Sequence, residues 1–300
     1  MFQPSPPRFL VGIEIAVIKV DQFESVFKSA AKLNFKRQEL SFQKIAVVTD
    51  LEEAEAKTLA ARVRAFLQVL GDGPEWMVLD RGQSERVEQL LGLVTQEKPE
   101  LLVTYRNLHS AAWRWPHSLG PRLDVLTQAT RCPVMVLPHP RDVSAFDASM
   151  QHTEVVMAVT DHLVGDSRLV SYAASFTEKG GDLFLTHIED DAIFERYIEV
   201  ISKIPSINTE NAREQIIKQL LKEPRDYIES CRRELKEEGL DLRIHSEVRT
   251  GHHLIEYKQL VEDHSVQLLV MNTKDEDQLA MHGLAYPLAV ELRQIPLLMV

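Results

Sequence analysis

The sequence predicts an α/β protein built from two tandem, doubly wound, Rossmann-like domains, each with a parallel five-stranded sheet. The first observation is a repeat: an apolar, β-rich run that ends in Thr-Asp occupies residues 44–50 and again residues 155–161. The second is that each copy closes on a similar apolar strand, at residues 131–137 and 294–300. The third is the alternation of strand-like and helix-like stretches, which favours parallel pairing through right-handed crossovers. A repeat of this length indicates duplicated domains rather than a solenoid.

The N-terminal block, residues 1–42, precedes the first copy of the repeat. Residues 9–20 predict a strand, and residues 23–33 predict an amphipathic helix with its larger apolar side chains on one face. We expect this block to pack on the first domain and to supply a strand that its sheet otherwise lacks. An unpaired sheet edge would expose backbone hydrogen-bonding groups.

The first domain, residues 43–138, reads as a shortened version of the second, and residues 139–153 read as a linker. The linker contains Pro140, Ser144 and Ser149 and shows no apolar periodicity, which is typical of a domain boundary. The predicted elements of the first domain are strands at 44–49, 76–79, 101–105 and 133–137, and helices at 52–70, 84–96 and 123–130.

The second domain, residues 154–300, has the complete pattern. Gly180 and Gly181 end its first helix, and a long, charged helical region is expected to break near Pro205 and Pro224. The predicted elements are strands at 154–160, 182–187, 242–249, 268–272 and 296–300, and helices at 166–178, 253–264 and 286–293.

The composition narrows the classes of function. A formal net charge of -11 and the lack of a basic stripe argue against a nucleic-acid partner and against anionic membrane surfaces. Two cysteines, Cys132 and Cys231, are too few for a disulfide framework and suggest reduced thiols. No apolar run is long enough to span a bilayer. We therefore expect a cytoplasmic location and no membrane partner.

The motifs that open and close the repeats resemble the universal stress protein family in its tandem two-domain form. The openings are Val48-Thr49-Asp50 and Val159-Thr160-Asp161, and Arg131-Cys132-Pro133-Val134 resembles the entry into the family's final strand. The turn from Val248 to Gly251, followed by residues 268–271, matches the family in the second domain. The resemblance covers about residues 43–137 and 153–300, and it implies the fold and a stress-related role.

Members of this family that bind ATP carry Gly-x-x-Gly, nine further residues, and then Gly-Ser or Gly-Thr. The glycines let backbone amides approach phosphates at a helix N-terminus. In the second domain Asn272 and Asp275 stand at the first two positions, and Leu284 replaces the hydroxyl residue after Gly283.

In the first domain Tyr105 and Leu108 stand at the first two positions of the same motif, and Gly120 is followed by Pro121. These degenerate motifs argue against ATP binding in both domains. In the second domain, the acidic residues 275–277 would also repel a triphosphate.

Polar residues follow the strands of the second domain at the edge where ligands bind in open α/β sheets. A small polar ligand, a cationic molecule or a divalent metal would suit this edge, since imidazole and carboxylate ligate zinc-like ions. The alternative interpretation is a solvated rim, because loops are polar in any protein. The candidate ligand residues are Asp161, His162, His187, His252, Thr273 and Asp275, of which His162, His187 and His252 are the metal candidates.

Asp50 and Asp161 each follow the first strand of their domain. In nucleotide-binding relatives an aspartate at this position contacts the adenine or ribose end, so the resemblance makes Asp50 a further candidate. The alternative is that each aspartate caps the following helix. The loop at residues 105–118 is rich in Trp, Arg and His, and we interpret it as an internal plug or a domain interface.

Two classes of function remain open. The first is a non-catalytic regulatory protein that senses a ligand or binds a partner, either a second copy or another protein. The second is a nucleotide-binding or nucleotide-hydrolysing enzyme that uses the second domain. The degenerate phosphate loops favour the first class, and neither the cofactor nor the signal follows from the sequence.

Overall fold

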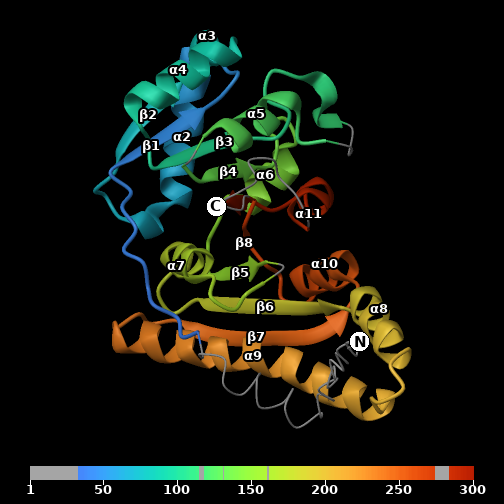
Figure 1. Ribbon diagram of the computed structural model, residues 1–300. Coiled ribbons are helices and arrows are strands. Elements are labelled where there is room, and N and C mark those ends of the chain that lie inside the picture. The colour runs from blue at the N-terminus through green and yellow to red at the C-terminus, as the bar shows by residue number, and fades with distance from the viewer. Residues whose placement is uncertain (1–32, 115–117, 131, 161, 274–283) are drawn as a thin grey trace, which may run out of the picture.

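The computed structural model describes residues 33–114, 118–130, 132–160, 162–273 and 284–300. These residues form one nine-stranded sheet in the order β2-β1-β3-β4-β9-β8-β5-β6-β7 (Figure 1). The α/β class expected from the sequence is confirmed. The strands are β1 (Lys44–Val48), β2 (Glu75–Leu79), β3 (Leu101–Tyr105), β4 (Val134–Leu137), β5 (Val155–Val159), β6 (Asp182–Asp190), β7 (Arg243–Gly251), β8 (Leu268–Met271) and β9 (Leu297–Met299).

Helices fill the connections between the strands, as the predicted crossovers require. Short 3-10 turns, η1 (Gln68–Leu70) and η2 (Ala111–Arg114), accompany them. The helices are α2 (Glu53–Phe66), α3 (Arg81–Ser84), α4 (Val87–Glu97), α5 (Pro121–Ala129), α6 (Val143–Ser149), α7 (Ser167–Phe176), α8 (Asp191–Ser202), α9 (Thr209–Glu237), α10 (His253–Asp263) and α11 (Ala285–Glu291).

The strand order repeats between the two parts of the chain. The first half runs β2-β1-β3-β4, and the second half, counted from its outer edge, runs β7-β6-β5-β8-β9. All neighbours pair in parallel except β4 and β9, which pair antiparallel through Val134 and Met299, Met135 and Leu298, and Val136 and Leu297. The two final strands therefore lie side by side, as expected. They also join the two strand sets into one sheet, and the described part of the first half contributes four strands to it.

Two elements differ from the sequence-based expectation. Pro224 lies inside α9 and does not break it, because Tyr227, Ile228 and Cys231 are buried on the adjoining turns and hold the helix against the sheet. Their burial offsets the backbone hydrogen bond that proline removes. The linker contains the short helix α6, which Asp142 caps by accepting the N–H of Ala145 (3.3 Å).

Residues 35–38 contact the second half, whereas Ser41 contacts Glu100 of the first half, on which we expected the N-terminal block to pack; for residues 1–32 that expectation stays a prediction. The N–H of Phe35 donates to Ser230 Oγ on α9 (2.9 Å), and the N–H of Gln38 donates to Ser171 Oγ on α7 (2.9 Å). Phe42 meets Phe176 edge to face, with 5.4 Å between ring centroids. The strand expected at residues 9–20, and all but the last residue of the helix expected at 23–33, lie outside the described residues.

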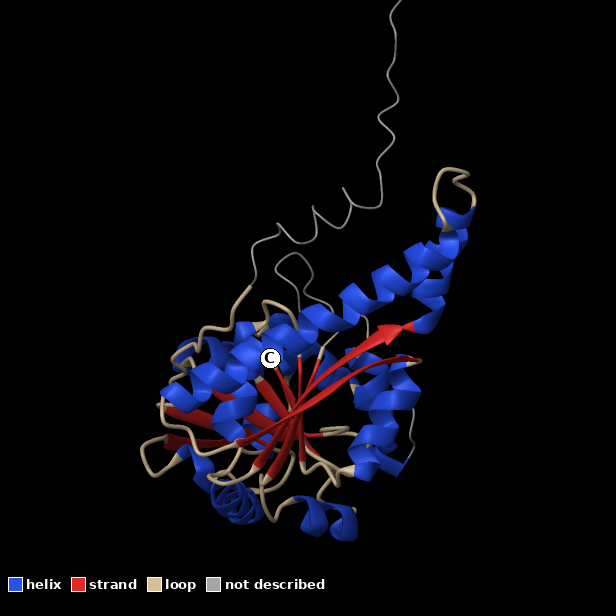
Figure 2. Cartoon of the chain, turned by 90° about the horizontal axis from the view of Figure 1, so that it is seen from below, coloured by secondary structure: helices blue, strands red, loops and turns tan. Residues whose placement is uncertain are grey.

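The outer strand β7 is covered by α9, which lies along it (Figure 1). Arg225 donates to the carbonyl of Val248 (3.1 Å), and Arg232 donates to the carbonyl of Ile244 (2.9 Å). These side chains occupy acceptors that another strand would otherwise pair with. Beyond the sheet, α8 and the start of α9 project as a two-helix arm (Figure 2). Within the described residues, none of the helices has the length and apolar character needed to cross a bilayer.

The turn before α5 depends on glycine. Gly120 has φ +98°, and a Cβ there would lie 2.8 Å from Cα of Asn107, which itself donates its N–H to the carbonyl of Leu119 (2.7 Å). Both the left-handed backbone and the close approach exclude a side chain at this position. The packing of the 105–120 loop against α5 therefore requires Gly120.

We predict that Gly120→Ala lowers the free energy of unfolding by about 2 kcal/mol or more, through backbone strain and the forced displacement of Asn107. Gly92→Ala is the matched control, because Gly92 lies in α4 and a Cβ there meets nothing within 4 Å. That change should leave stability unchanged or raise it by about 0.5–1 kcal/mol. Urea denaturation of both variants measures the difference, and equal stability of the two would contradict the prediction.

Candidate functional site

The carboxyl ends of β5, β6, β7 and β8 form the edge at which the sequence predicts a ligand. His187 lies near the end of β6 and is buried, with 6% of its surface exposed. Thr273 follows β8 and is also buried, whereas His162 and His252 are exposed. Asp161 and Asp275 lie outside the described residues. Their part in a site therefore stays a prediction.

His187 and Glu189 form a pair on one side of β6. They are two residues apart in a strand, so their side chains point to the same face. His187 Nε2 lies 3.4 Å from Glu189 Oε2, and both side chains are largely buried. Nδ1 of His187 is buried and has no hydrogen-bond partner among the described residues. An unsatisfied buried ring nitrogen costs free energy unless a further group occupies it.

The other polar residues of this edge have structural partners. His253 Nε2 donates to the carbonyl of Ile188 (2.7 Å), which fixes the start of α10 against β6. Thr273 donates its N–H to the carbonyl of Val300 (3.2 Å). The edge that remains for a ligand is therefore narrower than the sequence suggested, and it is centred on His187 and Glu189.

Asp166 is a residue of this edge that sequence reasoning did not identify. Its Oδ1 accepts the N–H of Leu169 (3.0 Å) and caps α7, and its other oxygen accepts the side-chain amide of Asn272. The sequence could have indicated Asp166, because an aspartate directly before a helical stretch is typical of an N-cap.

The equivalent edge of the first half is closed by Tyr105. Its hydroxyl donates to the carboxylate of Asp50, accepts the N–H of Asp50 (3.0 Å) and lies 2.8 Å from Thr49 Oγ1. The second oxygen of Asp50 accepts the N–H of His109 (2.8 Å). Glu52, not Asp50, occupies the N-cap position of α2, and it makes no side-chain cap bond. The capping interpretation of Asp50 is therefore wrong, and both of its carboxylate oxygens bind protein groups.

Ser84 and His139 complete this closed edge. Ser84 is fully buried and donates its hydroxyl to the carbonyl of Thr49 (2.6 Å), while the same oxygen lies 2.6 Å from Nε2 of His109. The rings of His139 and Tyr105 meet edge to face at 5.0 Å. Burial lowers the pKa of His139 to about 4, against a smaller opposing effect of the Asp50 charge. The imidazole is neutral at neutral pH.

Arg106 joins the two halves. The residue is 3% exposed, and its guanidinium donates to the carbonyls of Ala289 and Leu292 at the end of α11. Burial, with a smaller contribution from Arg293, lowers the pKa of Arg106 to about 9. At the start of the 105–118 loop, Tyr105 thus fills the edge of the first half, and Arg106 contacts the second half. Trp115 and His117 lie outside the described residues.

The three metal candidates are placed separately. Among the described residues, the one group of three or more His, Cys, Asp or Glu side chains close enough to share an ion consists of His152, Glu154 and Glu178. This group lies at the amino ends of β5 and β6, opposite to the edge where the sequence suggested a metal. Whether His162, His187 and His252 take part in ligand binding stays a prediction.

Neither a family model nor a curated protein matches the sequence. Solved structures do resemble the chain over most of its length, and universal stress proteins are among them. A protein of unknown function from Pseudomonas aeruginosa PAO1 is 13% identical, with 87% of this chain and 92% of that chain covered and a TM-score of 0.49. A universal stress protein from Archaeoglobus fulgidus DSM 4304 is 15% identical, with 87% and 98% covered and a TM-score of 0.48.

We predict that Tyr105→Phe lowers the free energy of unfolding by about 1–3 kcal/mol, because the ring still fits while the N–H and carboxylate of Asp50 lose a buried partner. Tyr197→Phe is the control, since Tyr197 is 60% exposed, and it should change stability by less than about 0.5 kcal/mol. Chemical denaturation measures both. Equal effects of the two substitutions would show that the Tyr105 hydroxyl does not hold the edge closed.

His139 should make the protein sensitive to acid. Its pKa in the folded protein, about 4, lies below the unfolded value of 6.5, so the unfolded chain binds more protons between these pH values. Stability contributed by neutral His139 is therefore present above pH 6.5 and is lost as pH falls towards 4, by up to about 3 kcal/mol. Unfolding of His139→Gln across this range should show a shallower loss than wild type. The exposed control His252→Gln should keep the wild-type slope.

Proposed function

We propose that this chain is a non-catalytic regulatory protein of the universal stress protein type, whose second half senses a small ligand at the carboxyl edge of its sheet. The observation that carries the proposal is the asymmetry of the two equivalent edges. Tyr105, Asp50 and His109 close the first edge with their own hydrogen bonds. The second edge keeps a buried histidine, His187, beside Glu189, and Nδ1 of His187 has no hydrogen-bond partner within the part of the chain that the structure describes.

The proposal also agrees with the motifs and the strand order. The repeated Thr-Asp openings and the Cys-Pro-Val-like entry resemble the family, and the two final strands pair as the duplicated pattern predicted. The family assignment accounts for a stress-related role, while the identity of the signal depends on the ligand.

A catalytic role receives less support from the described residues. Among the described residues, Ser84 lies 2.6 Å from Nε2 of His109, but it is fully buried and donates its hydroxyl proton to the carbonyl of Thr49. A nucleophile needs access to a substrate and a base that can take its proton. Ser84 is inaccessible to a substrate, and its hydroxyl instead helps to hold the closed edge together.

ATP is an unfavourable ligand for the second half. Asn272 stands where the family's first glycine lies, and its side chain is engaged with Asp166. Backbone amides can cradle phosphates only where side chains leave room. We expect the ligand to be a cation or a small cationic or polar molecule that pairs with Glu189 and with the free nitrogen of His187.

The test is a thermal-shift screen of divalent cations, polyamines and nucleotides, followed by calorimetry. We predict that Mg-ATP shows no low-micromolar affinity, and that any ligand that raises the melting temperature loses its effect in Asp161→Ala/His187→Ala. Lys57→Ala, on the exposed face of α2, is the control.

Tight Mg-ATP binding, or turnover of a nucleotide, would instead favour the nucleotide-dependent enzyme. A screen in which no compound stabilises wild-type protein would reduce the edge to a solvated rim. The remaining role would then be binding of a protein partner, which the oligomeric state in solution would begin to address.

A further inference from the structure

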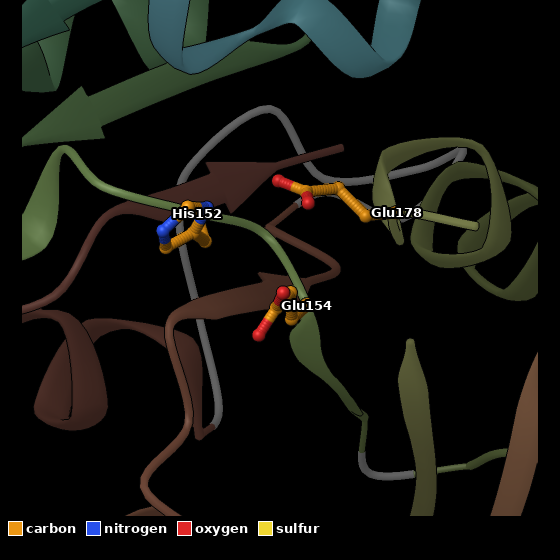
Figure 3. A group of neighbouring side chains, drawn as sticks. All are labelled: His152, Glu154 and Glu178. Atoms are coloured by element: carbon orange, nitrogen blue, oxygen red, sulfur yellow. The ribbon is translucent and has the colours of Figure 1, made fainter. Parts of the chain in front are cut away.

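His152, Glu154 and Glu178 gather at the amino ends of β5 and β6, outside the site described above (Figure 3). Each offers one ligand atom, and these atoms all lie within 4.8 Å of one another. Two carboxylates and an imidazole form a mixed oxygen and nitrogen donor set, which differs from an ordinary acidic surface patch. The group lies where the linker enters the second half.

The backbone around this group is held in place. His152 and Glu154 are two residues apart in the segment that leads into β5. Glu178 donates its N–H to the carbonyl of Thr153 (3.0 Å), and its Oε1 accepts the N–H of Thr153 (2.9 Å). One carboxylate oxygen of Glu178 is thereby fixed, while the other remains available.

Gly181 allows these segments to approach. A Cβ at this position would lie 2.6 Å from the carbonyl oxygen of Glu154 and 2.8 Å from that of Glu178. Only glycine permits this spacing, because real side chains do not approach backbone oxygens so closely. The backbone therefore brings Glu154 and Glu178 together independently of any side-chain attraction.

The charges of the two carboxylates are not balanced locally. Among the described residues, neither Glu154 nor Glu178 has a Lys or Arg nitrogen within 4.0 Å. Arg243 acts on Glu154 from a greater distance, but its guanidinium is bound to both oxygens of Asp182, at 2.8 and 2.6 Å. Like charges this close repel each other, and a divalent cation between them would reverse the sign of the interaction.

We propose that His152, Glu154 and Glu178 bind a zinc ion. Zinc takes imidazole nitrogen and carboxylate oxygen at about 2.0–2.2 Å, which places tetrahedral ligand atoms about 3.3 Å apart. The exposed side chains of His152 and Glu154 reach that spacing from 4.8 Å by rotation, whereas the backbone need not move. Magnesium and calcium prefer all-oxygen sites, so the histidine selects a softer ion.

The consequence of binding is a cross-link between the end of the linker and the connection from α7 to β6. Three protein ligands leave a fourth position for water, which is typical of an exchangeable site rather than a closed structural one. Zinc at this point would stabilise the entry of the linker into β5, and it would act at the opposite end of the second half from His187. The two sites are therefore separable by experiment.

The experiment uses untagged, chelator-treated full-length protein, titrated with zinc chloride by calorimetry and by thermal shift. We expect one equivalent to bind and to raise the melting temperature by about 5 °C at a hundredfold excess over Kd. Glu154→Gln and His152→Gln should each weaken binding about tenfold or more. Glu178→Gln keeps an oxygen for the N–H of Thr153, so it should fold normally and bind zinc equally weakly.

Glu88→Gln, an exposed carboxylate on α4, is the matched control and should bind zinc as wild type does. Circular dichroism without metal verifies that each variant is folded. Wild-type protein that binds no stoichiometric zinc would overturn the proposal. Wild-type zinc affinity in Glu154→Gln and Glu178→Gln would also overturn it, and so would a loss of zinc affinity in His162→Gln. In either case the ion would lie elsewhere.

Discussion

The antiparallel pairing of β4 with β9 is the contact on which the rest of the structure depends. It converts two strand sets into one sheet, and it removes two edges that would otherwise expose unpaired backbone groups. Arg106 crosses the same seam and donates to two carbonyls of α11. A buried guanidinium costs free energy unless it is hydrogen bonded. The contact between the two halves therefore favours the one arrangement in which Arg106 reaches its acceptors, and does not rest on apolar burial alone. The two halves are therefore expected to unfold together.

The direction of this pairing also sets where the sites lie. The strands of the first half run opposite to those of the second half. The carboxyl ends of the strands in one half therefore lie at the same end of the sheet as the amino ends of the strands in the other half. Tyr105 and Asp50 thus lie at the same end of the sheet as His152 and Glu154, while His187 lies at the opposite end. A ligand at His187 and an ion at Glu154 would act on opposite ends of the same strands, β5 and β6.

The sequence predicted those features that depend on local pattern. Apolar runs bounded by glycine or proline located the strands, and the duplicated motifs predicted that β4 and β9 would be neighbours. Pro224 was misread because the buried face of α9 outweighs one lost hydrogen bond, and burial is not visible in a single helix pattern. The cluster of His152, Glu154 and Glu178 was missed because the linker and the turn after α7 meet only in three dimensions. The capping alternative for Asp50 was wrong because its partner, Tyr105, is distant in the chain and could not be identified from local pattern.

The closed edge of the first half is held by hydrogen bonds within the protein. Tyr105 and Leu108 fill this edge with buried side chains. Tyr105 forms hydrogen bonds with Asp50 and Thr49, so the carboxylate of Asp50 is engaged by the protein itself. The second half carries no such plug among its described residues, and its His187 and Glu189 remain the groups with unused binding capacity.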